Sequence, residues 1–292
     1  MMTTTTYNTI FLNVCLLLSI AVALPCHAGD AALTVRLLTP AVAQGGTAFF
    51  MISAPDATAV TVHEGPTTIR AEARENGVWE AVLAVSMTTP PATRIISIEA
   101  ASADSVHRAQ VGLLVRKRHF PIQRLRMSRE DDAKYTAPSV HEEYRLIGAA
   151  LRHETARAWQ GAFQLPVAGR LSTLFGVQRY RNGKKVGAHK GIDIAAPRGC
   201  PVYAANAGVV TLCRTFGLHG RTVVLDHGVG IAGLYLHLRD FVVTEGQSVV
   251  AGQLIGHVGS TGAATGPNLH YGIYIHGVPV DPLLLRSVPD GW

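Results

Sequence analysis

The segment HKGID, from His189 to Asp193, places an imidazole and a carboxylate four residues apart. Residues four apart on an extended segment share a face, so both side chains are expected to approach one cation, with Gly191 leaving room on that face. Zn²⁺ accepts imidazole nitrogen and carboxylate oxygen at about 2.0–2.2 Å, and a catalytic zinc ion takes three protein ligands plus water. Because the H-x-x-x-D pattern is common by chance, a metal site requires a third ligand.

The third ligand is predicted from the strand-like segment TGPNLHYGIYIHG, residues 265–277. Successive side chains of a β-strand point to opposite faces, so the residues of this segment divide into two sets. The apolar face carries Leu269, Tyr271, Ile273 and Ile275. The other face carries Asn268, His270, Gly272, Tyr274 and His276. His270 therefore points away from the packed side. His276 lies about 20 Å further along, at about 3.3 Å per residue, and is expected to be exposed at a hairpin end. We select His270 as the ligand.

Other histidines fit a metal site less well. His141-Glu142 and His153-Glu154 each begin like the helical zinc motif H-E-x-x-H, but an arginine occupies the fifth position in both, so neither completes it and both histidines are predicted to face solvent. Structural or surface roles are predicted for five further histidines, which are His63, His107, His219, His227 and His257.

Three stretches extend the pattern: GRLSTLFGVQRYRNGKKVGAHKGIDIAAPRGCPVYAANAGVV, LDHGVGIAGLYLHL and GQLIGHVGSTGAATGPNLHY. From about Leu165 to Pro282, their order resembles the lysostaphin-type (LytM-like) zinc endopeptidases of bacterial peptidoglycan. The resemblance implies one Zn²⁺ per chain, held by His189, Asp193 and His270. It also implies that His237, within YLHL, assists catalysis.

Asn268 departs from the family pattern, which usually has a histidine at this position as the first member of an H-x-H pair. The family assigns that histidine to catalysis or oxyanion stabilisation. An asparagine amide can donate a hydrogen bond to a developing oxyanion, a contact worth about 3 kcal/mol, but it cannot carry a proton. We therefore expect Asn268 to polarise the substrate while His237 alone performs acid–base chemistry, in an active but slower or more specialised enzyme.

The predicted function is that of a secreted zinc metalloendopeptidase that hydrolyses peptide cross-links of peptidoglycan. Zinc would polarise the scissile carbonyl and bring the pKa of its water toward about 7, and His237, with an ordinary pKa near 6.5, could transfer protons. The alternative is a non-catalytic LytM-like module that binds the wall or activates another hydrolase. Such modules typically lose zinc ligands, whereas this chain retains all three. A third hypothesis, a purely structural wall-binding protein, is supported only by the net charge and the first β region.

The fold class predicted is mainly β. Short apolar segments from Ala32 to Val115 are separated by turn residues, including Asn76-Gly77, and indicate an N-terminal immunoglobulin-like β-sandwich over residues 29–117. A connector with a helix follows over 118–162, and the LytM-like antiparallel β domain is expected over 163–286.

The connector helix is predicted to begin at Ser139, where SVHE forms a capping box, and to end at Gly161. An apolar stripe at helical spacing supports it. The stripe consists of Tyr144, Ile147, Leu151 and Ala158.

The 292 residues are 48% hydrophobic and 16% charged, enough for one large or two ordinary domains. The apolar run from Phe11 to Leu24 is too short to span a bilayer and, with the A-x-A-like Cys26-His27-Ala28, predicts a signal peptide over residues 1–28. No Lys or Arg precedes Arg36, so the usual basic leader is missing. Lipid anchoring at Cys26 is disfavoured by Pro25. Export to the periplasm is the expectation.

The 26 basic and 20 acidic residues give a net charge of +6, which suits either simple solubility or an anionic polymer outside the cytoplasm. Basic clusters interleaved with aromatics are missing, which favours cell wall over nucleic acid. Cys200 and Cys213 flank PVYAANAGVVTL, an expected hairpin. A cross-strand disulfide, worth roughly 3 kcal/mol, and two buried thiols both remain open.

Overall fold

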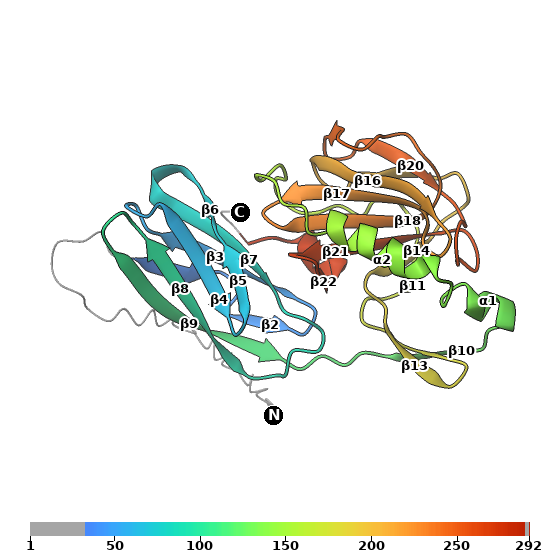
Figure 1. Cartoon of the computed structure of the whole chain (residues 1–292), viewed down its shortest axis with the longest axis horizontal. Helices are drawn as coiled ribbons and strands as arrows, with labels where there is room; N and C mark the ends of the chain where they lie inside the picture. The colour runs from blue at the N-terminus through green and yellow to red at the C-terminus, as the bar shows by residue number, and fades with distance from the viewer. Residues whose placement is uncertain (1–32, 290–291) are drawn as a thin grey trace, which may run out of the picture.

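Figure 1 shows the computed structural model of the chain, which describes residues 33–289 and residue 292. The predicted signal peptide, residues 1–28, lies outside the described residues. Across the described part of the chain, strands predominate, and every helix is too short or too polar to cross a membrane. The mainly β prediction is therefore confirmed.

The N-terminal part is a sandwich of two sheets around one apolar core (Figure 1). The first sheet has the order β1 (Thr34–Leu37), β3 (Thr47–Ser53), β7 (Val78–Ala84) and β6 (Glu72–Ala73). The second has the order β2 (Ala41–Ala43), β9 (Val106–Arg116), β8 (Thr93–Ala101), β4 (Ala59–Glu64) and β5 (Thr67–Arg70). Alternate side chains such as Phe50 and Ile52 are buried between the sheets. The predicted turn lies in the 3-10 segment Glu75–Gly77, where Asn76 and Gly77 both have positive φ.

The connector contributes a strand to a small sheet beside the C-terminal part. β10 (Ile122–Leu125) pairs parallel with β12 (Gln178–Arg181), which pairs antiparallel with β13 (Lys184–Ala188). Two helices follow β10, α1 (Arg129–Ala133) and α2 (Ser139–Ala150).

Helix α2 begins at Ser139 as predicted, but the expected capping box does not form. The carboxylate of Glu142 instead accepts hydrogen bonds from Arg145 at 2.6 Å, and no side chain caps the helix N-terminus. Tyr144 is 54% exposed and lies outside the buried face. The buried residues of α2 are Val140, Glu143, Ile147 and Ala150.

The expected helix end at Gly161 is also wrong, because α2 stops at Ala150. Backbone groups beyond this point find partners in distant elements. The N–H of Arg157 donates to the Glu72 carboxylate at 2.9 Å, and the N–H of Ala158 donates to the His227 carbonyl at 3.0 Å. These partners replace the hydrogen bonds that a continued helix would have supplied.

The C-terminal part is built on a large sheet, in which the pairings between the described strands are antiparallel. Its main path is β11 (Arg170–Thr173), β14 (Ile192–Ala195), β21 (Asn268–Ile275), β18 (Ile231–Phe241), β17 (Gly220–Gly228), β16 (Gly208–Phe216) and β19 (Ser248–Val249). Off this path lie β15 (Pro201–Tyr203), β20 (Leu254–Val258) and β22 (Val278–Val280), followed by the 3-10 helix Pro282–Arg286.

The two faces of β21 match the predicted alternation. Leu269, Tyr271, Ile273 and Ile275 belong to the main apolar core. On the opposite face Tyr274 packs in a second cluster that includes Ile147 of α2 and Leu236 of β18. Helix α2 therefore covers the face of the sheet from which His270 projects (Figure 1).

The segment between the two cysteines is not a hairpin. β15 pairs with β20, whereas β16 pairs with β17 and β19. Cys200 and Cys213 are half-buried free thiols, so the structure has two thiols and not the cross-strand disulfide. Burial, together with the nearby Glu245 charge, raises the pKa of the Cys213 thiol to about 11.

His276 lies in the turn between β21 and β22 as expected, but the prediction that it is exposed is wrong. Its side chain is 20% exposed, because the N-terminal sandwich packs against this turn. The Nε2 atom of His276 lies 3.2 Å from the carbonyl oxygen of Val82 on β7. Phe49 and Val82 of the sandwich also join the main C-terminal core.

Candidate metal centre

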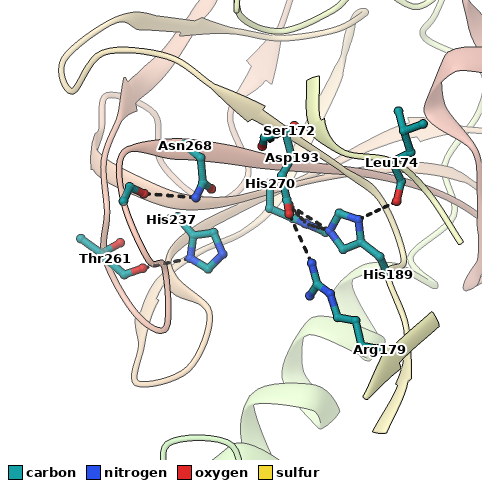
Figure 2. A network of polar contacts seen from close by, with 10 residues as sticks. Ser172, Leu174, Arg179, His189, Asp193, His237, Thr261, Asn268 and His270 are labelled. Carbon is teal, nitrogen blue, oxygen red and sulfur yellow. Dashed lines mark hydrogen bonds and ion pairs between the residues drawn. The ribbon is translucent and has the colours of Figure 1, made fainter. Parts of the chain in front are cut away.

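Three side chains predicted as metal ligands converge on one point of the large sheet (Figure 2). Asp193 on β14 and His270 on β21 are directly opposite in the antiparallel register. The Oδ1 atom of Asp193 lies 2.8 Å from Nδ1 of His270 and 2.9 Å from Nε2 of His189. The two imidazole nitrogens are 2.9 Å apart. Two nitrogens and one oxygen therefore face each other from segments far apart in sequence.

His189 reaches this point differently from the expectation. It follows β13 and precedes β14, so it does not share one extended strand with Asp193. Gly191 does leave room, but for another group. A Cβ at Gly191 would stand 2.9 Å from Nε2 of His270 and would also meet the backbone of Tyr271. The absence of a side chain at Gly191 thus admits the His270 ring.

The protonation states suit a cation. The Nδ1 atom of His189 lies 3.0 Å from the Leu174 carbonyl, to which it can only donate, so Nε2 keeps its lone pair in the neutral ring. Burial lowers the pKa of His270 to about 4, so this ring is neutral near pH 7. Burial alone would raise the pKa of Asp193, but the His189 and His270 rings that face its carboxylate hold this pKa far below its usual range.

This donor set fits zinc. Neutral imidazole and ionised carboxylate are the forms that bind the metal, and two histidines with one carboxylate make a three-ligand set of the catalytic type. His189 is 2% exposed and His270 is 8% exposed, which limits competition from bulk water.

Arg179 joins the cluster, although the sequence analysis did not select it. Its Nη2 atom lies 3.3 Å from Oδ2 of Asp193, whereas the two imidazoles contact Oδ1 (Figure 2). This contact fixes the carboxylate so that Oδ1 faces His189 and His270. Arg179 lies on β12 of the three-stranded sheet, within the first stretch quoted above, and its contact with Asp193 joins two different sheets, which no local pattern reveals.

His237 stands beside the three-residue cluster, with its ring centre 6.4 Å from that of His270. Its Nδ1 atom donates to the Thr261 carbonyl at 2.9 Å, which leaves the Nε2 lone pair available in the neutral ring. Burial lowers the pKa of His237. The backbone φ of His237 is +66°, an unusual value for a residue other than glycine and one often found at functional sites.

Asn268, the first residue of β21, lies on the His270 side of that strand. Its Nδ2 atom donates to the Gly266 carbonyl at 3.1 Å, while its buried Oδ1 atom has no hydrogen-bond partner in the described part of the chain. An amide nitrogen carries two hydrogens, so a second donor remains for another group.

Comparison with known proteins identifies this region. Residues 187–282 match Peptidase family M23. The chain contains an M23 peptidase domain. This confirms the predicted resemblance to lysostaphin-type peptidases at the level of the family. The matched segment includes His189, Asp193, His237, Asn268 and His270, whereas Arg179 and helix α2 precede it.

Two curated relatives match part of the chain. DD-carboxypeptidase/endopeptidase Mpg of Neisseria meningitidis serogroup B is 42% identical over 126 residues, which cover 42% of this chain and 29% of the relative. Peptidoglycan DD-endopeptidase ShyA of Vibrio cholerae serotype O1 is 42% identical over 111 residues, which cover 36% of this chain and 26% of the relative. The match thus spans less than a third of either relative's length.

A solved structure resembles more of the chain. A putative peptidase M23 from Pseudomonas aeruginosa is 26% identical, with a TM-score of 0.64, and the match covers 86% of this chain and 97% of that one. The likeness therefore extends well beyond the M23 domain and into the N-terminal β region.

The remaining histidines lie outside the cluster. His257 pairs with Asp240 at 2.6 Å, and His219 pairs with Glu143 at 2.8 Å. His227 is fully buried, with Nδ1 2.7 Å from the Ala207 carbonyl. His141 and His153 are exposed, as predicted for the incomplete zinc motifs.

Proposed function

We propose that this protein is an exported zinc metalloendopeptidase that hydrolyses peptide cross-links of peptidoglycan. The observation that carries the proposal is the convergence of His189, Asp193 and His270 within the M23 domain. The relatives named DD-endopeptidases support the substrate class. The non-catalytic alternative is less well supported, because a module without catalysis has no need to keep two nitrogens and one oxygen together.

The proposed roles follow from the hydrogen bonds. His189, Asp193 and His270 hold one zinc ion, which when bound supplies a Lewis acid and a water of lowered pKa. His237 takes and returns a proton at Nε2, because Nδ1 is committed to Thr261. Asn268 offers its second amide hydrogen to the oxyanion that develops on the scissile carbonyl.

The proposal also includes a division of the chain. We assign residues 1–28 to a signal peptide, 29–117 to an immunoglobulin-like sandwich, 118–162 to a connector and 163–286 to the peptidase domain. The strand orders β1-β3-β7-β6 and β2-β9-β8-β4-β5 support the immunoglobulin-like assignment, since they correspond to A-B-E-D and to a sheet containing G-F-C. A substrate in the cell wall supports export, with the periplasm as the proposed location.

The test is incubation of the purified protein with isolated sacculi, with and without a chelator, followed by identification of the released fragments. The proposal expects zinc-dependent cleavage of cross-linked peptides, lost in the chelated sample and restored by added zinc. Asp193→Asn serves as the inactive control. A wild-type protein that binds about one zinc ion per chain yet releases no fragments would instead support the non-catalytic alternative.

A further inference from the structure

A buried carboxylate outside the M23 domain reaches into the neighbourhood of His237. Glu143 lies on α2 and is 3% exposed. Its carboxylate accepts hydrogen bonds from three consecutive backbone N–H groups, of Gly217 at 3.0 Å, Leu218 at 3.1 Å and His219 at 3.2 Å. The Nδ1 atom of His219 lies 2.8 Å from the same carboxylate. These residues form the turn between β16 and β17.

This arrangement stabilises one conformation of the turn. Successive N–H groups that converge on one point make an anion-binding concavity, and here the anion belongs to the protein itself. Burial would raise the pKa of Glu143, but hydrogen bonds from the His219 side chain and from the backbone of Leu218 and His219 lower it, so the carboxylate is ionised. Charge-assisted hydrogen bonds of this kind are about twice as strong as neutral ones. Helix α2 and the turn are therefore held together.

The 217–219 turn and the start of β17 are linked to His237 by two sets of hydrogen bonds. The backbone N–H of His237 donates to the carbonyl oxygen of His219 at 3.3 Å. The N–H of Arg221 donates to Oγ1 of Thr261 at 2.9 Å, and the Thr261 carbonyl accepts from Nδ1 of His237 at 2.9 Å. The turn thus contacts the backbone of His237 directly, and β17, which begins at the end of the turn, reaches the ring through Arg221 and Thr261.

His237 needs this support because its backbone is in the left-handed region. Such a conformation costs on the order of 1–3 kcal/mol and persists only where surrounding contacts determine it. The sheet alone does not supply them, since the pairing of β18 with both β17 and β20 is irregular around His237. The 217–219 turn is one of the elements that supply the missing contacts.

We propose that Glu143 is a positioning residue, through which helix α2 fixes the 217–219 turn and so holds His237 in the orientation that catalysis requires. The inference rests on the proposed function. It makes α2 a part of the active enzyme, although the helix precedes the M23 domain. It also excludes the opposite role, in which α2 inhibits the site and its release increases activity.

The test compares Glu143→Gln with Glu142→Gln in the full chain. Glu142 is the neighbouring exposed carboxylate of the same helix and pairs only locally with Arg145. We expect Glu143→Gln to lower kcat on sacculi by about ten- to a hundredfold, the range for a misplaced catalytic group, with zinc content unchanged and KM within about twofold. Glu142→Gln should match the wild type.

A spectroscopic measurement separates positioning from general destabilisation. Histidine ¹⁵N NMR of the wild type should show His237 as the Nδ1–H tautomer, and Glu143→Gln should mix the two tautomers while the protein stays folded. In a His237→Gln background, Glu143→Gln should cause no further loss of kcat, because residues that act as a unit are not additive. An additive loss would overturn the proposal.

The remaining outcomes are also decisive. Higher activity of Glu143→Gln would show that α2 inhibits the site, and wild-type activity with an unchanged His237 spectrum would show that Glu143 has no positioning role. If Glu143→Gln does not fold, Glu143→Asp retains the charge with a shorter reach and should lower kcat in the same direction. An inert wild type would contradict the proposed function, while the His237 spectrum would still test the link to Glu143.

Discussion

Asp193 and His270 face each other at 2.8 Å although 77 residues separate them. The pairing of β14 with β21 sets this distance, because the two residues are directly opposite in the register. A shift of one residue would turn one of them into the apolar core, since successive side chains alternate between faces. The candidate metal centre therefore depends on the register of two neighbouring strands.

Removal of the Asp193 charge should abolish metal binding. In Asp193→Asn the two imidazoles remain without their anionic partner, and we expect zinc affinity to fall by more than about a hundredfold, beyond the loss typical of an outer-shell partner. Metal analysis after dialysis against zinc of known concentration measures this. Asp240→Asn is the matched control, since Asp240 also pairs with a histidine, His257, but lies outside the cluster. Equal zinc content in both variants would contradict the assigned ligands.

His237→Gln should separate catalysis from metal binding. The variant lacks a group that can carry a proton, and the loss of general acid–base catalysis corresponds to a decrease of about 10²–10⁴ in kcat. Zinc content should stay at the wild-type value, because His237 is not among the three residues that converge. His257→Gln, which alters a histidine paired with Asp240, should leave kcat unchanged. A His237→Gln enzyme with normal turnover would remove His237 from the mechanism.

Asn268 should act through its amide hydrogens. Asn268→Ala removes the donor, and we expect kcat to fall by about 10²–10³ with zinc retained, as for the loss of one oxyanion donor. Asn268→His restores a donor that can also carry a proton, so its kcat should equal or exceed that of the wild type. Turnover of a cross-linked peptide measures both variants. If Asn268→Ala were fully active, the amide would have no role in stabilising the oxyanion.

The sequence predicted the β21 part of the site well, because the information is local. Alternation from Leu269 to Ile275 depends only on which side chains are apolar, and the buried face of the sheet follows directly from it. His270 was therefore assigned to the correct face. The same reasoning failed for His189, since the chain leaves the extended conformation between β13 and β14.

Residues that act through distant contacts could not be predicted. Arg179 lies on β12 in the three-stranded sheet and approaches Asp193 on β14 of the large sheet, and Glu143 is one of two adjacent glutamates in a helix with one buried face. Helical spacing places Glu143 on the buried face with Ile147, but no local pattern reveals the 217–219 turn that its carboxylate contacts. The end of α2 was missed for a related reason, because Arg157 bonds to the N-terminal sandwich instead of continuing the helix.

His227 should make the stability depend on pH. Burial lowers its pKa to about 4, against an ordinary 6.5, although the Ala207 carbonyl and Asp226 oppose the shift. As the pH falls below about 6.5, His227 binds a proton in the unfolded chain but stays neutral in the folded chain. The free energy of unfolding therefore decreases between about pH 6.5 and pH 4. The full shift corresponds to roughly 3 kcal/mol.

Urea unfolding at pH 7 and pH 4.5 checks this expectation. In His227→Gln the difference in unfolding free energy between the two pH values should be smaller than in the wild type by roughly 2–3 kcal/mol. Groups common to both proteins cancel in this comparison. His141→Gln, at an exposed position of α2, should keep the wild-type difference. An unchanged difference in His227→Gln would mean that another group is responsible.

Arg157 should be essential for the packing of the N-terminal sandwich against the M23 domain. Its Nη1 atom lies 2.8 Å from Oε2 of Glu80 on β7, with the two side chains 7% and 4% exposed. Its guanidinium also lies 3.9 Å from the ring centre of Trp159. Arg157→Ala leaves the Glu80 carboxylate buried, and Arg74 at 3.5 Å compensates only in part. We expect a loss of about 3 kcal/mol, at the lower end for a broken buried pair.

Chemical denaturation measures the loss, and Arg145→Ala is the control. Arg145 also pairs with a glutamate, Glu142, but both side chains are largely exposed, so its removal should leave the unfolding midpoint unchanged. Because Arg157 lies far in sequence from the three proposed zinc ligands and contacts none of them, zinc content at low denaturant should stay normal. Equal midpoints for the two variants would show that the buried pair does not hold the sandwich in place.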